Sequence, residues 1–219
     1  MRIDLHTHTL LSDGELLPIE LARRALAKGH EGIAFTDHVS LSTIERVIKE
    51  ASRDCELAKE WSIEAILGVE ITHVPVSKID MVVAEARRLG AELVVVHGET
   101  ISEPVEKGTN RAAVNNPEVN VLAHPGFITL DEVQAAKDND IVLEITSRAA
   151  HSATNGHVVR LAREVGARMV VNTDTHAPGD LMSEDEAIVR GLAAGLSKVE
   201  AERAVRKTPL DVMRRIRRR

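Results

Sequence analysis

Short apolar runs alternate along the chain with amphipathic stretches of helical period. Several of these runs are nearly continuous Val, Ile, Leu and Ala, which is typical of strands buried on both faces of a parallel sheet. The predicted strands cover residues 3–8, 32–38, 65–72, 92–97, 119–124, 141–146 and 169–174. We therefore expect a parallel sheet with helices packed on its faces.

The stretches between the runs predict the helices. In residues 75–89 the apolar positions Ile79, Val82 and Ala86 recur at helical spacing. Gly29 suits the residue that follows a helix over residues 15–28. Further helices are predicted over residues 130–139 and 155–165, at two capping boxes formed by Ser183 with Glu186 and Ser197 with Glu200, and from Thr208-Pro209 onward.

The alternation of strand and helix repeats about seven times without an intervening linker. It predicts one α/β domain over residues 1–219, with the sheet either closed into a barrel or open and doubly wound. The least regular stretch, residues 100–117, is expected to be an active-site loop with weak helical content.

Composition narrows the class of protein. The 219 residues are 43% hydrophobic and 28% charged, as in a soluble globular domain. No apolar run is long enough for a transmembrane helix, and no secretory signal opens the chain. The single cysteine, Cys55, excludes an internal disulfide, so we expect a cytoplasmic protein with Cys55 buried as a small apolar side chain.

Charge and aromatic content argue against nucleic acid as a partner. The net charge is −6 and aromatic residues make up 1% of the chain, whereas such partners favour basic surfaces and aromatic stacking platforms. The basic run at residues 214–219 is interpreted as a solvated helix end. The sequence does not predict an oligomeric state.

Histidines and carboxylates gather where the predicted strands end. The set is His6, His8, Asp13, His38, Glu70, His97, His124, Asp174 and His176. The carboxyl ends of barrel strands open on one face, so these side chains should converge there. Clustered carboxylates and imidazoles are costly unless something binds them, and a divalent cation satisfies both groups. Without thiolates, the set suits Zn, Mn or Fe(II).

The ordered motifs carry a resemblance to a known family. Asp4-Leu5-His6-Thr7-His8, Ser12-Asp13-Gly14, Thr36-Asp37-His38, Gly68-Val69-Glu70, His97, Ala123-His124-Pro125 and Asp174-Thr175-His176 together resemble the PHP (polymerase and histidinol phosphatase) family. The resemblance implies a distorted, TIM-like (β/α)7 barrel and two or three divalent metal ions, Zn, Mn or Fe, at the carboxyl ends of the strands.

The resemblance also implies which residues hold each ion. One ion would take His6, His8, Glu70 and Asp174, and a second would share Glu70 and take His97 and His124. The third would take Asp13, His38 and His176, where some members carry histidine in place of Asp13.

The activity expected from this resemblance is phosphoester hydrolysis. Attack of a metal-activated hydroxide would release phosphate from a small phosphomonoester, either like histidinol phosphate or a nucleotide. Glu70, Asp174 and His176 are the expected catalytic residues, with either His176 or a metal-bound water protonating the leaving group. Alternatives are a PHP-type exonuclease or nucleotide phosphodiesterase, a module of a DNA polymerase, and an amidohydrolase-type metal hydrolase.

Residues that are not ligands should bind the substrate at the same mouth. Arg148 follows the sixth predicted strand and is the leading candidate for a phosphate clamp, because a guanidinium binds phosphate bidentately. A solvated loop cation is the alternative interpretation of Arg148. Lys107, Arg111 and His151 are further candidates, whereas His30 and His157 are expected on the surface.

Overall fold

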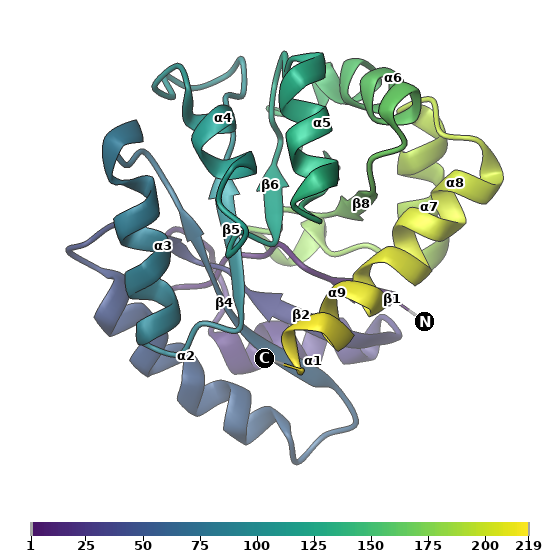
Figure 1. Cartoon of the computed structure of the whole chain (residues 1–219). Coiled ribbons are helices and arrows are strands. Elements are labelled where there is room, and N and C mark those ends of the chain that lie inside the picture. The colour runs from purple at the N-terminus through teal and green to yellow at the C-terminus, as the bar shows by residue number, and fades with distance from the viewer. Residues whose placement is uncertain (1, 219) are drawn as a thin grey trace.

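The predicted strands form one parallel, nearly closed barrel in the computed structural model, which describes residues 2–218 (Figure 1). Neighbouring strands follow the order β1-β2-β4-β5-β6-β7-β8, and the short β3 pairs with β4. The strands are β1 (Arg2–Asp4), β2 (His30–Phe35), β3 (His38–Val39), β4 (Glu64–Ile71), β5 (Leu93–His97), β6 (Val121–Ala123), β7 (Val142–Thr146) and β8 (Met169–Asn172). The predicted distorted (β/α)7 barrel is thus confirmed.

Helices surround the barrel (Figure 1). They are α1 (Pro18–Ala27), α2 (Ile44–Ala58), α3 (Ile79–Arg88), α4 (Thr109–Val114), α5 (Leu130–Asp138), α6 (Asn155–Val165), α7 (Glu184–Ala193), α8 (Lys198–Glu202) and α9 (Thr208–Ile216). Of these, α1 to α6 lie between strands along the chain, and α7 to α9 follow β8. Short 3₁₀ turns occur at η1 (Val76–Lys78), η2 (Ser152–Thr154) and η3 (Pro178–Asp180), and η4 (Arg203–Lys207) is π-helical. Both predicted capping boxes form, at Ser183 and at Ser197.

The barrel is distorted at the seam between β1 and β8. Side chains replace part of the backbone ladder there: Leu5 N donates to Asn172 Oδ1 at 3.1 Å, and Thr173 N donates to Asp4 Oδ1 at 3.2 Å. Further along, His8 N donates to the Thr175 carbonyl at 2.8 Å. The first and last strands are therefore shorter than predicted, and the histidines and carboxylate beyond them lie on extended segments that these bonds hold together.

Helix α9 closes the end of the barrel opposite the carboxyl ends of the strands. Its Val212 and Ile216 are buried in the same apolar cluster as Ile3, Val170 and other residues of the barrel interior. The basic run that begins in the last turn of α9 is not merely solvated, because Arg215 pairs with Asp140 and Arg217 pairs with Glu64, each at 2.5 Å. Among the described residues, α9 thus fills this end of the barrel, and the carboxyl ends of the strands form the opposite mouth.

Two further expectations are tested by the packing. Cys55 is buried in α2, as predicted. His30 is not on the surface: it is buried at the start of β2, where its Nε2 lies 2.7 Å from the Met182 carbonyl. His157 is half-buried on α6, 2.7 Å from the Ile128 carbonyl. Among the described residues, no helix is both long and apolar enough to cross a membrane.

Candidate metal centre

All nine predicted ligands meet at the carboxyl-end mouth. Their ligand atoms form overlapping groups within 4.8 Å: His8 with Asp13, His38 and His176; His6 with His8 and Glu70; His6 with His124 and Asp174; and His97 with His124 and His151. The strand ends thus converge as parallel strands in a barrel require. The last group also contains a histidine outside the nine, His151.

Glu70 lies at the middle of this set. Its carboxylate is fully buried, with Oε1 3.3 Å from His6 Nε2 and 3.5 Å from His124 Nε2. Its Oε2 lies 3.6 Å from His8 Nε2 and 2.7 Å from His38 Nδ1. Neither oxygen forms a hydrogen bond of good geometry among the described residues. A buried carboxylate without such hydrogen bonds is costly, so this arrangement favours a bound cation.

A close approach of two strand ends places His97 beside His124. Gly98 follows His97, and a Cβ at that position would lie 2.3 Å from the Ala123 carbonyl oxygen. Only glycine therefore allows β5 and β6 to end so close together. The two imidazole rings lie edge to face with centroids 4.4 Å apart.

Strained backbone occurs at two of the ligands. His124 has φ 25° and Asp174 has φ 53°, in the left-handed region that non-glycine residues seldom adopt. At Asp174 a hydrogen bond from its N to the His6 carbonyl, 3.0 Å long, holds this conformation. Strain of this kind persists where surrounding structure fixes it, and it is common at functional sites.

Glu144 is a residue of the centre that the sequence interpretation missed. It is fully buried on β7, and its Oε1 lies 2.7 Å from His6 Nδ1 and accepts from Asn172 Nδ2 at 2.9 Å. Its Oε2 accepts from His124 N at 3.0 Å. A carboxylate bound to Nδ1 leaves the Nε2 of His6 to face the centre, which is the usual support of a metal-binding histidine. The signal in the sequence was a lone acid within an apolar strand.

Burial and the neighbouring charges shift the pKa values of the side chains in the centre. Burial lowers the pKa of His6, but Glu144, Glu70 and Asp174 outweigh it and raise that pKa well above its usual range. Burial raises the pKa of Asp174 to about 6, whereas His6, His38 and His97 hold the pKa of Glu70 well below its usual range. Burial likewise lowers the pKa of His97 to about 4. Imidazoles next to buried carboxylates form a donor set that fits divalent metal ions.

Of the predicted substrate-binding residues, Arg148 and His151 lie at the centre. Arg148 Nη1 lies 2.8 Å from His176 Nδ1 and donates to the Asp174 carbonyl at 3.4 Å. His151 is buried and stacks on His124 with ring centroids 4.3 Å apart. Arg111 instead lies on α4, 3.9 Å from Glu132, and Lys107 is exposed on the preceding loop. That any of the four binds substrate stays a prediction.

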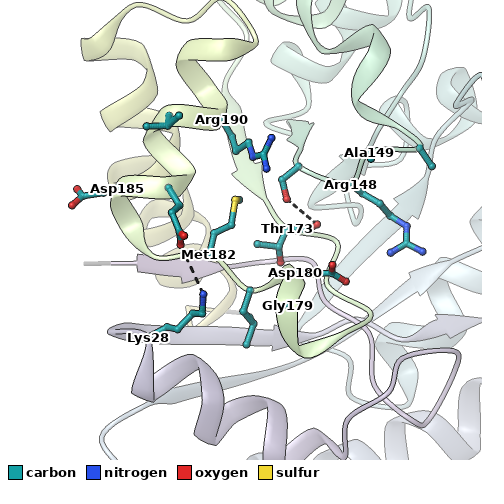
Figure 2. A pocket seen from close by; sticks show the side chains of 14 residues that line it. Lys28, Arg148, Ala149, Thr173, Gly179, Asp180, Met182, Asp185 and Arg190 are labelled. Carbon is teal, nitrogen blue, oxygen red and sulfur yellow. Dashed lines mark hydrogen bonds and ion pairs between the residues drawn. The ribbon is translucent and has the colours of Figure 1, made fainter.

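A pocket of about 810 Å³ adjoins the centre at Arg148. Figure 2 shows Arg148 on one side of this pocket and Lys28 on the other, with Met182 and Asp180 between them. Asp180 also supports the centre, because its Oδ2 accepts from His176 N at 2.9 Å. The pocket has the size of a small-molecule site and offers apolar surface together with charges of both signs.

Comparison with known proteins gives one family match and several relatives. Residues 4–164 match the family model described as PHP domain. An uncharacterised protein of Methanocaldococcus jannaschii is 48% identical over 99% of this chain and 100% of its own. A probable phosphatase of Caldanaerobacter subterraneus is 29% identical over 85% of this chain and 80% of its own. Ribonuclease P protein component 3 of Methanosarcina barkeri is 26% identical over 93% of this chain and 85% of its own.

The solved structures agree on the fold. A chain in the cryo-EM structure of archaeal ribonuclease P with mature tRNA matches 98% of this chain and 89% of its own, with a TM-score of 0.69. Its identity to this chain is 16%, so the likeness shows a shared fold alone.

Proposed function

This chain belongs to the PHP domain family, and we propose that it is a metal-dependent hydrolase that releases phosphate from a small phosphomonoester. The observation that carries the proposal is the convergence of nine imidazole and carboxylate side chains at one mouth, with an arginine beside them. The family match also favours this interpretation over an amidohydrolase. A relative named as a probable phosphatase supports the same class of reaction.

By resemblance to the family, the residues would form three ligand sets that each hold one ion. The sets are His6, His8, Glu70 and Asp174; Glu70, His97 and His124; and Asp13, His38 and His176. When bound, divalent ions supply Lewis-acid stabilisation of the phosphate oxygens and lower the pKa of water toward neutrality. Glu70 would join the first two sets, because its Oε1 lies near His6 of the first set and near His124 of the second.

The chain's own residues bind and orient the reactants. Asp180 holds the backbone of His176 and Ala177 through hydrogen bonds of 2.9 Å and 2.8 Å, which fixes the loop that carries His176. Arg148, one third exposed, presents a guanidinium to a phosphate at the edge of the centre. The proton for the leaving oxygen comes from His176 or from water.

The adjoining pocket would take the organic part of the substrate. Its volume, about 810 Å³, suits a group of the size of a nucleoside or of histidinol. Lys28 and Arg190 line it together with Asp185 and Glu186, so the pocket tolerates groups of either charge. Both substrate types expected from the sequence therefore remain candidates.

Replacing Arg148 with alanine is expected to lower kcat/KM for a phosphomonoester about ten- to a hundredfold. Hydrogen bonds to a charged group contribute roughly 1.5–3 kcal/mol, and about 1.4 kcal/mol corresponds to a factor of ten. Steady-state kinetics with inorganic phosphate release checks this, and metal content should not change. Arg160→Ala, an exposed arginine on α6, serves as the control. Unchanged kcat/KM in Arg148→Ala would exclude Arg148 as the phosphate clamp.

Nucleic acid is the second candidate substrate class. The relatives named ribonuclease P protein component 3 favour it, because one of them aligns with 93% of this chain. Against it stands the pairing of the basic C-terminal residues Arg215 and Arg217 with acidic residues. With a net charge of −6, the chain offers little attraction to a polyanion.

One assay separates these substrate classes. Purified protein is compared on p-nitrophenyl phosphate, histidinol phosphate, nucleoside monophosphates, and short single-stranded DNA and RNA, each with and without chelator. We expect chelator-sensitive phosphate release from the monoesters and no shortening of the oligonucleotides. Oligonucleotide cleavage without release from any monoester would assign the chain to the nuclease class instead.

A further inference from the structure

Glu103 lies on the loop between β5 and α4, and its carboxylate faces three histidines. Its Oε2 is 3.0 Å from His73 Nε2 and 3.3 Å from His97 Nε2, and its Oε1 is 3.5 Å from His151 Nε2. Of these histidines, only His97 belongs to the nine ligands described above. Glu103 is thus a further acidic side chain, outside the nine predicted ligands, in contact with the centre.

The atom of His97 that Glu103 approaches is the one left to bind a metal. His97 Nδ1 lies 3.1 Å from the Gly98 carbonyl, which leaves Nε2 free for an ion. Two ligands that each lie about 2.1 Å from one ion are roughly 3.0–3.4 Å apart at octahedral or tetrahedral angles. The 3.3 Å between Oε2 and His97 Nε2 is therefore the spacing of two ligands to the same ion.

The surroundings of Glu103 hold its carboxylate toward the centre. His151 is buried, and its Nδ1 lies 2.7 Å from Thr100 Oγ1, so its Nε2 is directed toward Glu103. His73 follows β4 with a left-handed φ of 51°, and its ring lies 5.2 Å from the ring of His97. Ligand atoms of His73, His97 and Glu103 lie within 4.8 Å of one another, as do those of His97, His124 and His151.

We propose that Glu103 is a further metal ligand, which binds the ion held by His97 and His124 and is positioned by His73 and His151. The inference rests on the proposed function, because it adds a residue to the same centre. Glu70 is fully buried, whereas Glu103, with its side chain 38% exposed, approaches His97 from the solvent side. It would therefore retain that ion when no substrate is bound.

The test compares Glu103→Gln with Glu106→Gln. Glu106 lies on the same loop and is exposed, with its Oε2 accepting from Val76 N at 3.0 Å, so it matches Glu103 in charge and setting. Gln at position 103 keeps the volume and still accepts hydrogen bonds from His73. The protein is loaded with Co²⁺, its visible absorption spectrum is recorded, and the Co²⁺ is then competed away with a chromophoric chelator.

We expect Glu103→Gln to change the Co²⁺ absorption bands and to lower the affinity for one Co²⁺ ion about ten- to a hundredfold or more. A loss of about ten- to a hundredfold is already typical when a residue that merely supports a ligand is replaced. Glu106→Gln should match the native protein. His73→Ala should lower the affinity for the same ion by a smaller factor, because His73 positions Glu103 and does not itself bind the ion. An unaltered spectrum and affinity in Glu103→Gln would overturn the inference and make Glu103 part of a surface ion pair. Failure of the native protein to bind any Co²⁺ would instead overturn the metal centre itself.

Discussion

The Glu70→Gln variant is expected to lose hydrolysis by at least about a thousandfold while keeping its fold. Both oxygens of this buried carboxylate face imidazoles of two ligand sets, so an amide there removes a charge that two ions would share. Metal-ion stabilisation is worth several kcal/mol, and about 4 kcal/mol corresponds to a factor of roughly a thousand. Phosphate release under saturating metal measures the loss, and circular dichroism tests the fold.

A matched control lies on the same strand. Glu64 is at the other end of β4, where its exposed carboxylate pairs with Arg217, so Glu64→Gln should keep native turnover. If Glu70→Gln keeps turnover within about threefold of native, a shared carboxylate is not needed and the assignment of Glu70 is wrong.

Replacing His8 with alanine is expected to abolish most of the activity as well, by about a hundredfold or more, with loss of bound metal. His8 belongs to two of the ligand groups, since it lies near Glu70 and also near Asp13, His38 and His176. Its ring stacks on that of His176 with centroids 4.2 Å apart, so alanine also leaves a space beside a neighbouring ligand. The effect should be milder than that of Glu70→Gln, because other ligands of each ion remain.

The control for His8→Ala is a histidine that lies outside the centre. His157 on α6 is half-buried and contacts the Ile128 carbonyl, so His157→Ala removes an imidazole without touching the nine ligands. Metal content and phosphate release are measured for both variants. Native metal content and turnover in His8→Ala would exclude His8 from the centre.

The sequence predicted the barrel and the convergence of side chains at its strand ends, but not the bonds that close its seam. Ligands such as His97 and His124 were recognised because they end apolar runs, and parallel strands bring such ends to one face. The seam was not predictable, because the bonds of Asn172 with Leu5 and of Asp4 with Thr173 join residues far apart in the chain. Propensity and periodicity report only local preferences, so such long-range pairs leave no pattern.

The residues that support the ligands were missed for a related reason. Glu144 stands within a strand and not at its end, so nothing in its spacing distinguishes a buried support of His6 from an ordinary acid. The same holds for Glu103, because a loop has no regular spacing from which the direction of a side chain can be predicted. His30 was assigned to the surface because its burial depends on the distant Met182.

The metal content of the native protein tests the central claim most directly. Protein purified without chelator should carry two or three ions of Zn, Mn or Fe per chain by elemental analysis, because nine ligand side chains meet at the mouth of the barrel. Fewer than one ion per chain under metal-replete conditions, with hydrolysis intact, would contradict it.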